Sequence, residues 1–208
     1  METRITQPGP LLKENGEVSI AGWSPQPLLD SNLENANFYA LKFLQPLRMK
    51  RWDYYGLTTK THYFSFTVSD IGYLGMVFAY VIDFENKTMH EETISTPFAS
   101  GVNIPRNSQD GVTQYKNNKV NLTFYTTNDQ RKIAVNWTNF ENGQDLRAEY
   151  KLDLPAGHES MNLVIPIEKR RFYFNRKINC MPASGWVEYR GQKYDLTPNT
   201  ALGNLDWG

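Results

Sequence analysis

Hydrophobic and polar positions alternate with a period of two along most of the chain after Lys50. The clearest case is segment 146–154. Its apolar residues are Leu146, Ala148, Tyr150, Leu152 and Leu154, and its charged residues are Arg147, Glu149, Lys151 and Asp153. Successive side chains of a β-strand point to opposite faces, so this pattern predicts a strand with a buried face and a solvated face.

Other segments give related patterns. Residues 62–68, 120–124 and 133–137 also alternate, whereas residues 76–82 are apolar on both faces, which predicts a central strand covered on both sides. Asn142-Gly143 predicts a tight hairpin, because both central positions of that turn tolerate a positive φ. Gly191 is placed to turn a last hairpin.

The predicted strands recur every ~8–12 residues and are joined by Asn, Asp and Gly turns, which favours an antiparallel all-β barrel or strongly bent sandwich. Because no helix with a clear 3.6-residue period follows Lys50, repeated strand–helix–strand units are excluded. We expect an extended arm over residues 1–49, a β-barrel or sandwich domain over residues 50–170, and strands that begin a second, truncated β half over residues 171–208.

The first thirty residues are rich in proline and glycine, which favours an arm lying on another surface, with Trp23 as its anchor. Ser31-Asn-Leu-Glu34 predicts the cap of a short helix that ends at Pro46. Residues 95–110 predict a long loop, a kind of segment that often carries function.

The charge balance makes one class of partner less favoured. Lys plus Arg and Asp plus Glu number 22 each, so the formal net charge is zero, which argues against nucleic acid as the main partner. For the basic runs 169–171 and 176–177, solvated strand ends are favoured over an anion site. The absence of a run of ~20 apolar residues predicts no transmembrane segment, and without an apolar leader a cytoplasmic location is the default.

Familiar catalytic motifs are absent from the sequence, including glycine-rich nucleotide loops and zinc-protease signatures. His62, His90 and His158 lie on different segments, so we expect no metal and no cofactor. Cys180 is the only cysteine, and a buried, slowly reacting thiol is favoured over a nucleophile.

The candidate ligand-binding residues are aromatic and acidic. At the start of the first strand after the arm, Trp52 and Tyr54 share one face, and Asp53 and Tyr55 share the other. An Asp beside a Tyr on an inward face could act as a general acid or as a hydrogen-bonded anchor, although a solvated strand-start Asp is favoured. Glu188 raises the same alternatives.

Asp206 lies between Leu205 and Trp207, where a carboxylate is costly unless it is paired. The segment stops without a polar tail, and an isolated strand is unstable. We therefore expect residues 197–208 to be loosely ordered or packed against a neighbouring chain, with Asp206 near the mouth of an aromatic pocket.

Several of these segments carry a family resemblance. Together they resemble an uncharacterised family, domain of unknown function 2804, over nearly the whole chain; the segments are 22–27, 50–55, 71–73, 177–185 and 205–208. That family is similar to tandem lipocalin-like proteins that include the carotenoid hydratases, which pair two barrel-like halves around an apolar ligand. The resemblance implies a lipocalin-like barrel, a chain that covers only the N-terminal part of the family's region, and Asp206 as a catalytic candidate.

Two main functions follow from this resemblance and from the aromatic residues. The first is binding of an apolar small molecule, a lipid or terpenoid, in a barrel mouth near Trp52 and Tyr54. The second is hydration of an isoprenoid alkene by a carboxylic acid, Asp206 or Asp53. A structural role without a ligand is a third alternative. The residues name no substrate and no oligomeric state.

Overall fold

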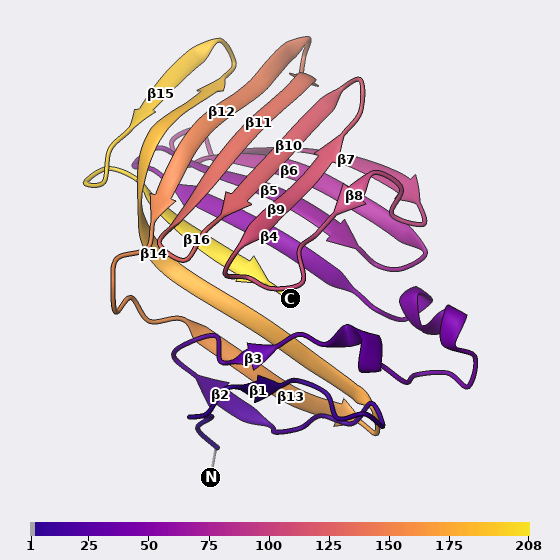
Figure 1. The fold of residues 1–208 in the computed structure, drawn as a ribbon. Helices are drawn as coiled ribbons and strands as arrows, with labels where there is room; N and C mark the ends of the chain where they lie inside the picture. Colours follow the sequence, from indigo (N-terminus) through magenta and orange to yellow (C-terminus); the bar gives the residue numbers. More distant parts are fainter. Residues whose placement is uncertain (1–2) are drawn as a thin grey trace.

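The computed structural model describes residues 3–208, which form a curled β-sheet with an N-terminal arm at one end (Figure 1). The arm contains β1 (Gly9–Pro10), β2 (Gly22–Ser24), β3 (Leu29–Asp30) and the 3-10 helices η1 (Leu33–Asn35) and η2 (Lys42–Leu47). The remaining strands are β4 (Arg51–Thr58), β5 (His62–Asp70), β6 (Leu74–Asp83), β7 (Thr88–Pro97), β8 (Val102–Asn103), β9 (Gly111–Lys116), β10 (Val120–Thr126), β11 (Gln130–Glu141), β12 (Gln144–Asp153), β13 (Met161–Glu168), β14 (Arg171–Tyr189), β15 (Gln192–Leu196) and β16 (Leu202–Trp207).

The main sheet is antiparallel and runs in the order β7-β6-β5-β4-β16-β14-β12-β11-β10-β9-β8. It curls so strongly that β5 contacts β8 and β9 from the opposite end of the sheet. Figure 1 shows the two resulting layers, β4–β7 behind β9–β12. This architecture confirms the expected all-β fold, a bent antiparallel sheet that forms a half-barrel.

The core lies between the two layers and is filled by side chains. Its largest fully buried members include Tyr55, Phe64, Phe66, Phe124, Trp137 and Phe140. The alternation predicted for segment 146–154 is confirmed from Leu146 to Leu152, whereas Leu154 is only half-buried. A small barrel of this kind is solid inside because inward side chains fill it.

Strand β6 departs from the sequence expectation. Its side chains alternate, with Val77, Ala79 and Val81 buried and the residues between them half-exposed. It is the second strand from the edge, so the prediction of a central strand covered on both faces was wrong. The large apolar residues on its outer face, such as Phe78, lie in a half-exposed layer.

Strand β14 connects the arm end of the structure, where it pairs with β13, with the main sheet. Its first part pairs with β13 and β16, and its second part pairs with β12 and β15. The pairing with β16 shifts register between Ile178 and Met181, where Cys180 adopts a φ of 58°. Cys180 is exposed at this bulge, so the prediction of a buried thiol was wrong.

The C-terminal segment is a central strand. β16 pairs with β4 on one side and with β14 on the other, so the expectation of a loosely ordered tail was wrong for residues 202–207. β14 and β16 join the same sheet as β4 to β12. The proposed division of the chain after residues 49 and 170 stays a prediction.

The arm packs against β13 through β2, in which Trp23 is the register partner of Leu163. A second small core forms there from Ile5, Leu11, Leu12 and Val164. The expected capped helix near Ser31 is replaced by η1 and η2, and Pro46 lies inside η2 rather than after it. Within residues 3–208, no helix has the length and apolar character to cross a membrane.

Candidate functional site

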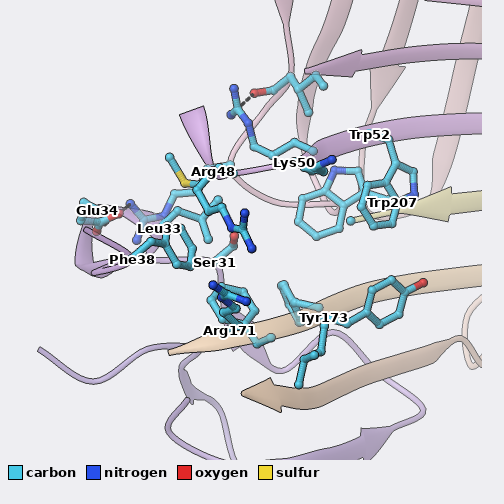
Figure 2. Close-up of a pocket in the computed structure, with 18 of the residues that line it drawn as sticks. Ser31, Leu33, Glu34, Phe38, Arg48, Lys50, Trp52, Arg171, Tyr173 and Trp207 are labelled. Carbon is cyan, nitrogen blue, oxygen red and sulfur yellow. Dashed lines mark hydrogen bonds and ion pairs between the residues drawn. The ribbon is translucent and has the colours of Figure 1, made fainter. Parts of the chain in front are cut away.

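A cavity of about 490 Å³ lies between the N-terminal arm and the sheet (Figure 2). Its walls come from η1 and the segments before and after η2, from the start of β4, from the loop after β8, from the end of β13 and the start of β14, and from the end of β16. The residues that line it are Ser31, Leu33, Glu34, Phe38, Arg48, Met49, Lys50, Arg51, Trp52, Ile104, Pro105, Arg106, Ile167, Arg171, Phe172, Tyr173, Phe174, Trp207 and Gly208. We call it the arm–sheet cavity.

Aromatic rings form much of the wall of the arm–sheet cavity. Trp52 stacks on Tyr173 with ring centroids 5.9 Å apart, and Phe174 meets Trp207 edge-to-face at the same separation. Figure 2 shows Trp52 and Trp207 on one side and Tyr173 on the facing strand. Such pairs fix one another's orientation, so these four rings, which we call the aromatic floor, form a preformed apolar surface.

Asp206 holds Trp52 in place. The indole Nε1 of Trp52 donates to Asp206 Oδ1 at 2.8 Å, and the side-chain amide of Asn175 donates to the same oxygen at 2.6 Å. Lys177 Nζ donates to the other carboxylate oxygen. Three donors share this one carboxylate. Asp206 is thus held in place and can fix the orientation of the Trp52 indole. The charge of Asp206 is therefore paired, which explains how a carboxylate is tolerated between two apolar neighbours in the sequence.

Replacement of Asp206 by alanine is expected to lower the free energy of unfolding by about 1–2 kcal/mol, because Trp52, Asn175 and Lys177 lose their shared acceptor. The effect is moderate since the Asp206 and Lys177 side chains remain 28% and 33% exposed, so that solvent screens their charges. Chemical denaturation measures the change. Asp195→Ala, which removes an exposed carboxylate on β15, is the control and should change the value by less than about 0.5 kcal/mol. Equal values for the two variants would contradict the role of Asp206.

A separate polar cluster lies on the inner face of the sheet. Asp53 is 2% exposed, and its Oδ2 accepts a hydrogen bond from Thr113 Oγ1 at 2.6 Å. Arg131 and Arg176 are also buried, and both guanidinium groups donate to the carbonyl oxygen of Ser108. Arg176 therefore lies in the interior, and the prediction of a solvated strand end for it was wrong.

Burial perturbs the titration of this inner cluster. It raises the pKa of Asp53 to about 6, while the hydrogen bond from Thr113 and the charge of Arg131 act in the opposite direction. Burial, together with the positive charge of Arg131, lowers the pKa of Arg176 to about 10. The second oxygen of Asp53 has no hydrogen-bond partner among residues 3–208. Asp53 does not line the arm–sheet cavity.

The other candidate residues are dispersed. Tyr54 lies on the outer face, where its hydroxyl contacts those of Tyr63 and Tyr80 at 2.5 and 2.9 Å, and burial raises its pKa to about 12. Tyr55 is buried in the core and packs edge-to-face against Phe124. Glu188 lies near the far end of β14, 4.0 Å from Arg147. Of the six candidates, the structure brings together Trp52 and Asp206.

Sequence reasoning missed most of the arm–sheet cavity. Tyr173, Phe174 and Trp207 could have been suspected from the density of aromatic residues at the start of β14 and the end of β16. Phe38 and Arg48 belong to the arm, and only its packing brings them opposite β14. Arg171 belongs to a basic run that was assigned to a solvated strand end; it is exposed, and it also lines the cavity.

Solved structures with similarity to this chain include two proteins. A protein from Nitrosomonas europaea described as an AttH candidate is similar with 12% identity and a TM-score of 0.47, over 76% of this chain and 51% of that one. Kievitone hydratase from Nectria haematococca has 11% identity and a TM-score of 0.39, over 81% of this chain and 50% of that one. The chain thus spans about half the length of each. Comparison with curated proteins found no match.

A comparison with protein families gives a match over nearly the whole chain. The family model for the domain of unknown function DUF2804 matches residues 2–208. This range includes β4 and β16, which carry Trp52 and Asp206, and the arm residues that line the cavity. The chain therefore belongs to the DUF2804 family.

Proposed function

We propose that this protein binds an apolar small molecule, a lipid or terpenoid-like compound, in the arm–sheet cavity. The observation that carries the proposal is the aromatic floor, which is held in place before any ligand enters. A volume of about 490 Å³ lies within the range typical of sites for one small molecule. Fixed aromatic walls lose little freedom on binding, which favours affinity.

The position of the proposed site differs from the barrel mouth suggested by the sequence. The interior of the half-barrel is occupied by its own core, with Phe64, Phe124 and Trp137 among the residues that fill it. The aromatic surface that remains accessible lies at the edge of that core, to which Trp207 belongs, where the arm faces the start of β14. Trp52 belongs to this surface and Tyr54 does not.

Acid-catalysed hydration is the second candidate, and one observation favours it. Asp53 has a pKa near 6, which suits a group that exchanges protons near neutral pH. Its enclosure counts against this function, because Asp53 is separated from the arm–sheet cavity and only 2% exposed. Asp206 is engaged by three donors, so it is better suited to positioning than to proton transfer. Binding without chemistry is therefore the function we favour.

Titration with the neutral dye Nile red tests the proposal, because its fluorescence rises in an apolar site. We expect saturable binding, and about tenfold weaker binding by the Trp52→Ala protein, since one face of the aromatic floor is lost. Trp186→Ala is the matched control: Trp186 lies on the same long strand as Tyr173, outside the cavity, with Lys193 over its ring. Equal affinities of the two variants, or no saturable binding by the wild-type protein, would overturn the proposal.

A further inference from the structure

Positive charge gathers around the arm–sheet cavity although the whole chain has a formal net charge of zero. Five cationic side chains line it, against one carboxylate, that of Glu34; the cations are Arg48, Lys50, Arg51, Arg106 and Arg171. A low-dielectric wall of aromatic rings beside these charges strengthens their field. The cavity is thus both apolar and positive.

Some of these cations are already neutralised. Arg51 pairs with Asp70 at 2.7 Å, and Arg106 pairs with Asp30 at 2.6 Å and also contacts Glu34. In contrast, neither Arg48 nor Lys50 has an ion-pair partner within the described part of the chain, residues 3–208. Two positive charges at the cavity are therefore available to a ligand.

Arg171 is a third available cation. Its partner is Glu168, at 2.7 Å, and the two side chains are 48% and 61% exposed. An exposed pair of this kind contributes little to stability, so Arg171 can exchange Glu168 for a ligand group at small cost. Figure 2 shows Arg48 and Arg171 extending into the same part of the cavity, from the arm side and from β14.

We propose that the ligand of this cavity is an amphipathic molecule with one anionic group, a carboxylate or a phosphate monoester. Arg48, Lys50 and Arg171 bind that group, and the apolar body lies on the aromatic floor; this inference rests on the proposed function. Planar guanidinium groups match carboxylate and phosphate oxygens in a two-point geometry, and charge-assisted hydrogen bonds are the stronger kind. The cavity thus selects its ligand by charge as well as by shape.

Displacement of Nile red by ligands of equal chain length tests the inference. Dodecanoate and dodecyl phosphate are expected to displace the dye at concentrations about tenfold or more below that of dodecan-1-ol, and dodecyltrimethylammonium should be the weakest competitor. The advantage of dodecanoate should shrink as salt is added, because the cations are partly exposed. Each competitor is used below its micelle concentration.

A double variant, Arg48→Gln with Lys50→Gln, locates the effect. The ratio of dodecanoate to dodecanol affinity should fall towards one in this protein. A change in the fold would weaken the binding of both ligands, so dodecanol serves as the internal reference. Lys42→Gln with Lys60→Gln changes the net charge equally at positions outside the cavity and should keep the wild-type ratio. Both of these results support the inference.

Three other outcomes distinguish failure of the anion inference from failure of the proposed function. If dodecanol displaces Nile red as well as dodecanoate and dodecyl phosphate do, the anion inference is overturned while the proposed function stands. The same holds if the two double variants lower the ratio equally, because the effect is then one of overall charge. If the dye does not bind saturably to the wild-type protein, the proposed function itself fails.

Discussion

Replacement of Leu152 by alanine is expected to lower the free energy of unfolding by about 2–5 kcal/mol. Leu152 is fully buried on β12, and its side chain packs against Gly203 of β16, where a glycine leaves room for it. Removal of the leucine leaves a cavity. The neighbouring strands cannot easily move in to fill it, because hydrogen bonds hold them in the same curled sheet. The measurement is the midpoint and slope of denaturant unfolding.

Leu202→Ala is the matched control for this prediction. Leu202 is the neighbour of Gly203 on β16 but is 41% exposed, so its truncation should cost less than about 1 kcal/mol. The same Leu-to-Ala change at a buried and at an exposed position thus isolates the effect of burial. Similar losses in the two variants would contradict the buried position of Leu152.

Removal of the Asp53 titration is expected to change how stability depends on pH. The folded-state pKa of about 6 exceeds the ordinary value of 3.8, so between these pH values the folded protein keeps a proton that the unfolded chain loses. The free energy of unfolding contributed by Asp53 therefore falls as the pH rises from about 4 to about 6 and stays constant above that range. The total change is about 3 kcal/mol.

The Asp53→Asn variant lacks this titration. Its free energy of unfolding, relative to that of the wild-type protein, should rise by about 2 kcal/mol between pH 4 and pH 7, which is most of the total change. Unfolding curves at several pH values measure the difference, in which the contributions of all other titrating groups cancel. Parallel curves for the two proteins would contradict a raised pKa at Asp53. Asp195→Asn, an exposed acid, should run parallel to the wild-type protein.

Local patterns were sufficient to predict most of the strands. The alternation around Leu152 gave both the strand and its buried face, because one side of an antiparallel sheet is dry and the other is wet. The same logic failed at β6, where large apolar side chains cover the outer face of a strand near the edge. It failed again at Cys180, because a β-bulge at a residue other than glycine cannot be recognised from the local sequence.

The candidate site depends on contacts that no local pattern contains. Trp52 and Asp206 were each unusual in the sequence, a strand-start tryptophan and a carboxylate between apolar residues, but they are 154 positions apart. Their meeting requires β16 to lie beside β4, whereas the sequence suggested a loose tail. The arm residues Phe38 and Arg48 enter the cavity only through tertiary packing. Tertiary structure, rather than any motif, therefore assembles the site.

The central claim is that an apolar small molecule binds in the arm–sheet cavity. Photo-crosslinking with a diazirine-bearing long-chain alcohol tests it most directly, when the modified residues are then mapped by mass spectrometry. Binding in the arm–sheet cavity predicts adducts at residues 38, 48–52 and 172–174 that excess Nile red suppresses. Adducts that lie instead on the outer-face cluster of Tyr54, Tyr63 and Tyr80, or that Nile red leaves unchanged, would contradict it.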